Sequence, residues 1–132
     1  MGNSYPRRGD RDYIAERIKD VFYVKEVATE ELIDEVFATV NDRNKAIKTL
    51  AISKSAIRHN MSNDIKEFDV PTCIVWGRQD DVTPPEVADK FKDLMPNSEL
   101  HWIDECGHAA MMERPEEFNT IIQKWLDKLL PN

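Results

Sequence analysis

The sequence predicts an α/β fold in which a helical segment, residues 1–66, is followed by a β-α-β-α unit with parallel strands, residues 67–132. Hydrophobic residues recur at helical spacing through the first half. Two short apolar runs, "TCIVW" and "ELHWI", occur only in the second half, and such runs are typical of strands buried on both faces of a parallel sheet. Residues 77–98 between them are long enough for the right-handed crossover that parallel strands require.

Three helices account for the first half. Asp10 is a candidate N-cap for the first, whose apolar face would consist of Ile14, Ile18, Val21 and Phe22. Thr29 can cap the second, and residues 41–44 ("NDRN") should end it. Its stripe contains Leu32, Ile33, Val36, Phe37 and Val40. A third helix is indicated by Ile47, Leu50, Ala51 and Ile57.

The second half begins after a polar connection, residues 62–71. A strand is expected over Thr72–Trp76, and a second one over Glu99–Ile103. Prolines delimit the helices: Pro85 can open the first as its initial residue and Pro96 stops it, and Pro115 opens the last, which Pro131 ends. The apolar stripe of that last helix consists of Phe118, Ile121, Ile122, Trp125, Leu126 and Leu129.

Composition narrows the classes of function. The net charge of −7 argues against a general affinity for nucleic acid or anionic membrane. No apolar stretch approaches a membrane span, and the N-terminus has no signal-peptide core. Cys73 and Cys106 are interpreted as small buried hydrophobes rather than a disulfide framework. These features together favour a cytoplasmic protein.

Polar residues that could perform chemistry follow each expected strand. The loop "GRQDDVTPP" offers Asp80 and Asp81, and the loop "DECGHAAM" offers His108. Because the carboxyl ends of parallel strands meet at one edge, an acid and a histidine should come together there. A carboxylate that accepts the Nδ1 proton of an imidazole fixes its tautomer and stabilises the imidazolium. Gly107 would allow a tight turn just before the ring.

Structural interpretations compete with this one. A histidine in a surface turn is usually only polar, and "DD" before "TPP" can be turn chemistry followed by a helix cap. His101 lies within an expected strand and His59 on an expected helix, so both favour structural roles. Neither has metal-ligand spacing, and the sequence suggests no cofactor or metal.

Two segments together resemble the C-terminal part of an α/β-hydrolase: "PTCIVWGRQDDVTPPEVADKF" (residues 71–91) and "PNSELHWIDECGHAAMMERPEEFNTIIQKWL" (residues 96–126). In that family a late strand ends in W-G-x-x-D before a proline, and the last strand leads to G-H and an E-x-P-x-x-F helix. The resemblance places Asp80 at the triad acid, with Asp81 as second choice, and His108 at the triad histidine. Residues 10–61 resemble the later part of the family's cap.

The branch that the sequence resembles most contains meta-cleavage-product hydrolases and related esterases, which implies ester or C–C bond hydrolysis. The family nucleophile lies in G-x-S-x-G, and no pair of the four glycines frames a serine. The serines without that context are Ser4, Ser53, Ser55, Ser62 and Ser98. Three interpretations follow: a truncated hydrolase that is inactive alone, one half of a split enzyme whose N-terminal half is another polypeptide, or a non-catalytic, self-associating module.

Self-association is expected in any of these cases. The strand Thr72–Trp76 would normally have a neighbour on each side, and a bare apolar edge is a template for pairing with another chain. We therefore expect a homo-oligomer formed through this edge and the cap helices, with two strands meeting across a two-fold axis.

Overall fold

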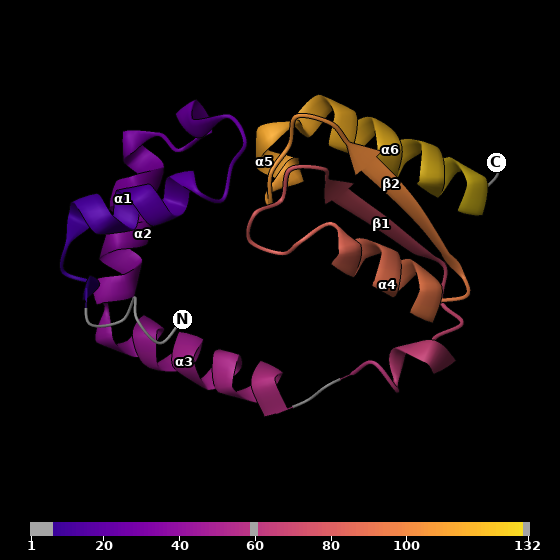
Figure 1. Ribbon diagram of the computed structural model, residues 1–132, viewed down its shortest axis with the longest axis horizontal. Coiled ribbons are helices and arrows are strands. Elements are labelled where there is room, and N and C mark those ends of the chain that lie inside the picture. The colour runs from indigo at the N-terminus through magenta and orange to yellow at the C-terminus, as the bar shows by residue number, and fades with distance from the viewer. Residues whose placement is uncertain (1–6, 59–60, 131–132) are drawn as a thin grey trace. The chain divides into compact units, whose positions relative to one another are not determined.

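The computed structural model describes residues 7–58 and 61–130, and these fall into two compact units (Figure 1). The helical unit comprises residues 7–19 with 28–58 and 61. The sheet unit comprises residues 20–27 with 62–130. Residues 20–27 thus fold with the C-terminal unit, although the sequence predicted that they belong to the helical segment 1–66. The physical reason is that their backbone forms hydrogen bonds with His108 and Glu113 of the sheet unit.

The helical unit contains α1 (Arg11–Lys19), α2 (Glu30–Asn41) and α3 (Arg43–Arg58). Both expected caps are present: Tyr13 N donates to Asp10 Oδ1 at 3.0 Å, and Leu32 N donates to the Thr29 side chain at 3.2 Å. Ile14, Ile18 and Ile33 are buried. Arg11 forms ion pairs with α2, to Glu30 at 2.7 Å and to Asp34 at 2.6 Å.

The first helix is shorter than the hydrophobic pattern predicted. It ends at Lys19, so Val21 and Phe22 lie beyond it rather than on its face. Phe22 is buried all the same, because its segment packs within the sheet unit. The periodicity was misleading here because an apolar pair that anchors a tertiary contact has the same spacing as a continued helical stripe.

The sheet unit is built around two parallel strands, β1 (Thr72–Gly77) and β2 (Ser98–Ile103). Thr72 lies opposite Ser98 and Gly77 opposite Ile103, so the strands start and finish together. The crossover helix is α4 (Glu86–Leu94), and α5 (Ala110–Glu113) and α6 (Pro115–Leu129) follow β2. Figure 1 shows α4 and α6 on opposite sides of the sheet. Short 3-10 turns, Lys25–Val27 and Ile65–Glu67, complete the unit.

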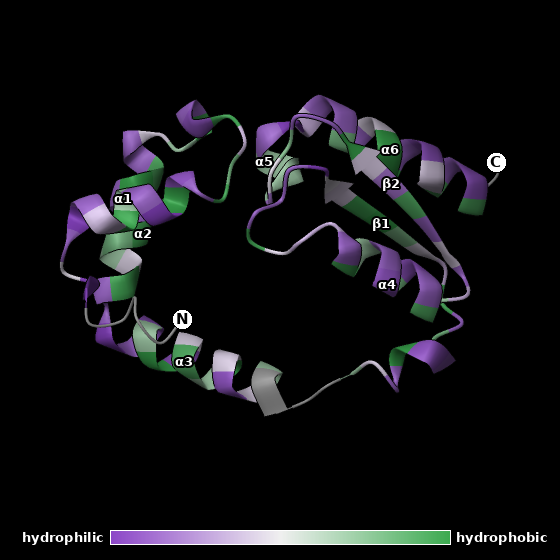
Figure 2. Cartoon of the chain, in the orientation of Figure 1, coloured by the Kyte–Doolittle hydropathy of each residue, from purple (hydrophilic) through white to green (hydrophobic). Residues whose placement is uncertain are grey.

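The strands pack on both faces, as continuous apolar sequences require. On the α6 side the buried residues Ile103, Cys106 and Ala110 form a core with Val75, Phe118 and Ile121. On the α4 side the rings of Trp76 and Phe91 lie 6.3 Å apart, and Ala88 is fully buried. Figure 2 shows β1 as mostly hydrophobic, whereas α4 and α6 carry polar and apolar faces.

The expected boundaries need small corrections. Pro85 precedes α4 as its N-cap instead of forming its first residue, whereas Pro115 does open α6. The short helix α5 was not expected. Pro131 and His59 lie outside the described residues.

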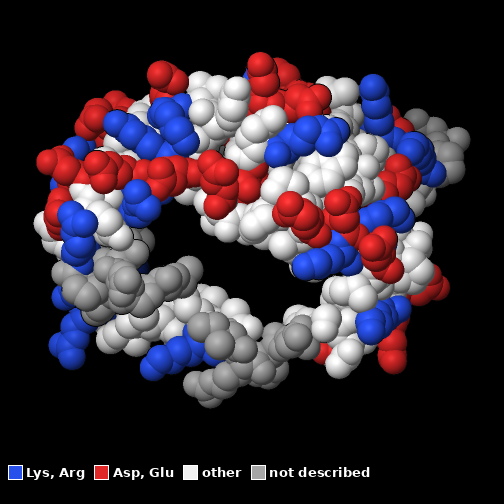
Figure 3. All heavy atoms as spheres, in the orientation of Figure 1, with Lys and Arg blue, Asp and Glu red and all other residues white. Residues whose placement is uncertain are grey.

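Acidic and basic side chains are interspersed on the face shown in Figure 3. In the part of the chain that the structure describes, no helix combines the length and apolarity needed to cross a bilayer.

Candidate active site

The two loops at the carboxyl edge of the sheet are joined by backbone hydrogen bonds. Arg78 N donates to Ile103 O at 2.9 Å, and Gln79 N donates to Cys106 O at 3.0 Å. The Gln79 side chain returns the contact, because its Oε1 accepts from Cys106 N at 3.1 Å. These bonds hold the loop after β1 beside the loop after β2, which brings the residues that follow them together.

Asp80 is a buried carboxylate whose two oxygens have different partners. Its Oδ1 accepts from Val82 N at 2.9 Å and from Thr83 N at 2.8 Å, an arrangement in which an Asp side chain closes a turn. Trp76 Nε1 donates to Thr83 O at 3.3 Å and fixes the far side of this turn. The turn leaves Oδ2 available to a partner from another loop. Only 4% of Asp80 is exposed.

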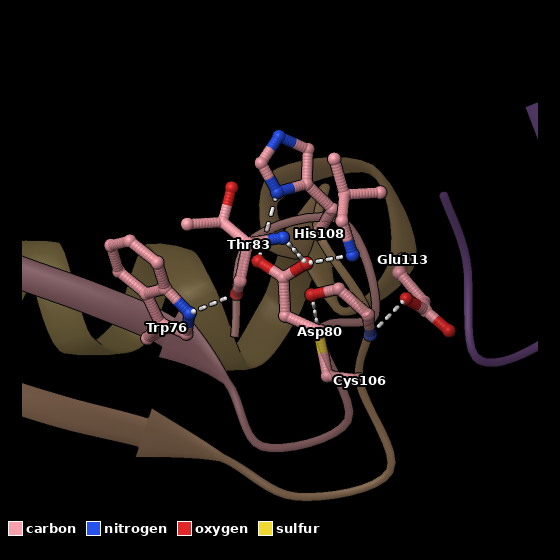
Figure 4. A network of polar contacts seen from close by, with 8 residues as sticks. Trp76, Asp80, Thr83, Cys106, His108 and Glu113 are labelled. Atoms are coloured by element: carbon pink, nitrogen blue, oxygen red, sulfur yellow. Dashed lines mark hydrogen bonds and ion pairs between the residues drawn. The ribbon is translucent and has the colours of Figure 1, made fainter. Parts of the chain in front are cut away.

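His108 is that partner. Its Nδ1 lies 2.8 Å from Asp80 Oδ2, and because an ionised carboxylate only accepts, Nδ1 carries the shared proton. Figure 4 shows the other ring nitrogen, Nε2, pointing away from the carboxylate. The imidazole is 43% exposed, whereas the Asp80 side chain is 3% exposed. The buried carboxylate therefore anchors the ring at Nδ1 and leaves Nε2 on the opposite side of the imidazole.

Asp81, the alternative acid, is exposed and takes no part in this bond. His101 lies on β2, opposite Val75, with its Nε2 3.4 Å from Glu99 Oε2. The structure thus brings together the first-choice pair, His108 and Asp80. Among the described residues, no group of three or more His, Cys, Asp or Glu side chains could hold a metal ion.

Glu113 is a buried polar residue that sequence reasoning missed. Its Oε2 accepts from Gly107 N at 2.7 Å, and its Oε1 accepts from Val24 N at 2.6 Å. The only signal in the sequence is its place in the E-x-P pattern after Gly-His, which indicates a motif but no role. Its burial depends on the packing of residues 20–27, which no local pattern reveals.

Gly77 and Gly107 lie where the backbone packs so closely that there is no room for a side chain. A Cβ on Gly77 would overlap the carbonyl of Gly107. A Cβ on Gly107 would lie 2.6 Å from Val21 O and 2.8 Å from Tyr23 N. The tight-turn explanation for Gly107 is wrong, because no described glycine has a positive φ, and the left-handed residue in this loop is Glu105 with φ 49°. Gly107 is instead a point of close backbone approach.

Cys106 lies directly before Gly107 and is fully buried. Burial, reinforced by the nearby Glu113 carboxylate, raises the pKa of its thiol to about 11. The neutral thiol is therefore strongly favoured, and it behaves as the small hydrophobe that the sequence suggested. Both Cys73 and Cys106 are free cysteines.

The geometry matches a general acid–base pair. A histidine whose Nδ1 proton is held by a buried carboxylate can accept a proton at Nε2 and later return it. The carboxylate stabilises the imidazolium that forms between these two steps.

Comparisons with known proteins show the family of the chain. A family model described as the alpha/beta hydrolase fold matches residues 22–115. A 2-hydroxy-6-oxononadienedioate/2-hydroxy-6-oxononatrienedioate hydrolase from Pseudomonas sp. is 30% identical over 113 residues, which cover 83% of this chain and 40% of the relative.

Two solved structures are also similar. An alpha/beta hydrolase enzyme from the metagenome of sediments of the Mar Chica lagoon, Morocco, is 61% identical, with a TM-score of 0.67 over 75% of this chain and 45% of that one. A serine hydrolase involved in carbazole degradation is 28% identical, with a TM-score of 0.76 over 89% of this chain and 47% of that one. The chain spans less than half the length of these relatives.

Proposed function

Because the chain belongs to the alpha/beta hydrolase fold family, we propose that it supplies the histidine and the acid of a serine-type hydrolase. The observation that carries this proposal is the 2.8 Å bond between His108 Nδ1 and the buried Asp80 Oδ2. In this role His108 is the general base and acid, and Asp80 orients it.

The proposed mechanism uses Nε2 of His108. As a serine hydroxyl attacks the substrate carbonyl, Nε2 removes its proton, and Asp80 stabilises the imidazolium. The same proton then passes to the leaving group. In the second half of the cycle Nε2 activates the water that releases the enzyme-bound acyl group.

The serine must come from sequence that these 132 residues do not contain, because they have no G-x-S-x-G. We expect the chain alone to be essentially silent, since a base without its nucleophile lacks the group that forms the covalent intermediate. The missing serine can belong to the same polypeptide or, in a split enzyme, to another one.

The substrate class is an ester or a C–C bond next to a carbonyl. The names of the relatives support this choice: one acts on 2-hydroxy-6-oxononadienedioate, and a second is a serine hydrolase of carbazole degradation. Both chemistries need the same proton transfers from the histidine, so the His108–Asp80 geometry serves either.

A fusion protein tests the proposal. The N-terminal part of the 61% identical hydrolase, joined before this chain, should restore a complete family fold. We expect it to cleave p-nitrophenyl esters, and we expect His108→Ala to lower kcat/KM by at least about 10³-fold. His101→Gln is the matched control, because this histidine lies within β2 and not in the loops that follow the strands. Its kcat/KM should stay within about threefold of the wild-type value. Circular dichroism checks that both variants fold.

The outcomes separate the candidates. Cleavage that His108→Ala leaves intact would refute the proposed role. Cleavage restored by the N-terminal part as a separate polypeptide would identify a split enzyme. A folded fusion that cleaves neither p-nitrophenyl esters nor a ring-fission product would favour the non-catalytic, self-associating module.

A further inference from the structure

We propose that Glu113 is a positioning residue for His108: its buried carboxylate ties the Gly107–His108 backbone to residues 20–27 and thereby holds the imidazole against Asp80. The catalytic meaning of this role rests on the proposed function. The hydrogen bond that it protects can be measured in the chain itself.

The carboxylate of Glu113 bridges two segments that are distant in sequence. Each oxygen accepts one backbone N–H, Oε2 from Gly107 at 2.7 Å and Oε1 from Val24 at 2.6 Å. The residue is 9% exposed. A buried carboxylate is costly unless donors compensate its charge, and bonds from N–H groups to an ionised acceptor are among the stronger hydrogen bonds in proteins. The bridge is therefore a strong local constraint.

The segment that Glu113 holds also binds the histidine directly. His108 N donates to Val21 O at 2.8 Å, three residues before the Val24 N–H that Glu113 accepts. The Gly107 Cα lies so close to residues 21–23 that a Cβ there would be 2.6 Å from Val21 O. Glu113, residues 21–24 and the Gly107–His108 backbone thus form a closed ring of contacts, and Figure 4 shows Glu113 directed at the backbone that leads to His108.

Asp80 is held by different contacts. Its Oδ1 binds the amides of Val82 and Thr83, and Glu113 takes no part in these bonds. Loss of the Glu113 bridge should therefore loosen only one partner of the pair. This asymmetry distinguishes positioning of His108 from a general contribution to stability.

Glu113→Gln is the informative variant. It keeps the size of the side chain but replaces one accepting oxygen with an NH₂ group, which would face a backbone N–H. The shorter carboxylate of Glu113→Asp keeps the charge but cannot span both amides, and it provides a second test. Glu117→Gln, an exposed acid on α6, is the matched control.

The experiment is nitrogen-15 NMR of the 132-residue chain. The imidazole Nδ1 proton of His108 is assigned by its loss in Asp80→Asn. We expect this proton to exchange at least about tenfold faster with water in Glu113→Gln and Glu113→Asp. Each variant weakens the bonds from the backbone amides to the Glu113 carboxylate, and the imidazole is then held less firmly against Asp80. The Val82 and Thr83 amides should keep their protection, and Glu117→Gln should match the wild type.

Two results would overturn the inference. One is unchanged exchange of the Nδ1 proton in a folded Glu113→Gln chain. The other is loss of the Val82 and Thr83 protection together with that of His108 in both variants, which would make Glu113 a general stability residue. The absence of a protected Nδ1 proton in the wild-type chain would contradict the geometry itself.

The fusion protein separates this inference from the proposed function. There Glu113→Gln should lower kcat about 10- to 100-fold with little change in KM, because it misplaces the base without altering substrate contacts. An inactive wild-type fusion with the NMR effect intact would refute the function and leave the positioning role standing. An active fusion in which Glu113→Gln changes neither kcat nor proton exchange would refute only the positioning role.

Discussion

The choice of Asp80 as the partner of His108 is settled by two oxygens with separate tasks. Oδ1 closes the turn through the amides of Val82 and Thr83, which fixes the plane of the carboxylate. Oδ2 then faces Nδ1 of the imidazole at 2.8 Å. The turn therefore sets the direction in which Oδ2 faces the imidazole, which is the preorganisation that the proposed proton transfer needs.

Cys106 gives a prediction on pH. Its folded-state pKa of about 11 exceeds the ordinary value of 9.0, so the neutral thiol stabilises the fold below pH 9, and this contribution is lost as the pH rises through 11. Between these pH values the free energy of unfolding should fall more steeply in the wild type than in Cys106→Ala, as urea titrations monitored by circular dichroism would measure. Parallel slopes for the two proteins would contradict it.

At the scale of single residues, the sequence predicted that His108 meets an acid, but not the turn that orients Asp80 or the role of Glu113. Parallel strands bring their carboxyl ends together, so the meeting of His108 with Asp80 or Asp81 followed from the order of elements. The choice between the two acids depends on which side chain closes the turn, and local composition does not reveal that. Glu113 was missed because its burial is a tertiary property.

Among the elements, β1 and the loop after β2 approach each other most closely. Gly77 ends β1 directly against the carbonyls of Cys106 and Gly107, with no room for a side chain. The same contact brings Gln79 within reach of Cys106 N, and so places Asp80 beside His108.

Gly77→Ala should therefore destabilise the fold by about 2–3 kcal/mol or more, since the added methyl group meets backbone that cannot rotate away. Gly9→Ala is the control, because a Cβ there meets nothing within 4 Å. Urea unfolding measures both. A Gly77→Ala chain as stable as Gly9→Ala would show that the two loops separate easily.

The caps give a second prediction at this scale. Thr29→Ala removes the acceptor of Leu32 N and should cost about 1 kcal/mol. Thr120→Ala is the control: its hydroxyl only bonds the Glu116 carbonyl inside an exposed part of α6, so the free energy of unfolding should change by no more than about 0.5 kcal/mol. Equal losses for the two variants would argue against the cap.

The elements were predicted correctly where a capping residue or a proline marks a helix end. Asp10 and Thr29 cap helices as expected, and Pro115 opens α6. It failed where a pattern had two explanations, as at Val21 and Phe22, and where the element was too short to show a period, as in α5.

For the whole molecule, the sheet is its most unusual part. Among the described residues β1 pairs only with β2, so its other edge has no strand neighbour. Near its start, Val70 is 65% exposed and Phe68 is 42% exposed.

We expect the chain to self-associate through this edge, because unpaired N–H and C=O groups beside apolar side chains favour pairing with another copy. Sedimentation at micromolar concentration should show a dimer or larger species. The amides of Thr72 and Arg78 face β2, so in the alternating strand the Cys73 amide faces the free edge. Cys73→Pro removes that amide and should weaken the association if the variant folds. The fusion protein should be less associated, since the family segment would cover the edge. A stable monomer would contradict the expectation.

At this scale the sequence indicated the family and the parallel topology, because the W-G-x-x-D and G-H segments each follow a strand. It could not place residues 20–27, which Val21 O and Val24 N join to the sheet unit through His108 and Glu113. That placement depends on distant partners, Glu113 above all.

The most direct measurement of the central claim is kcat/KM of the fusion protein with Asp80→Asn beside Asp81→Asn. If Asp80 holds the Nδ1 proton of a catalytic His108, Asp80→Asn should lower kcat/KM by about 10³- to 10⁴-fold, and Asp81→Asn should stay within about threefold. Equal values for the two variants, or a larger loss in Asp81→Asn, would contradict the claim.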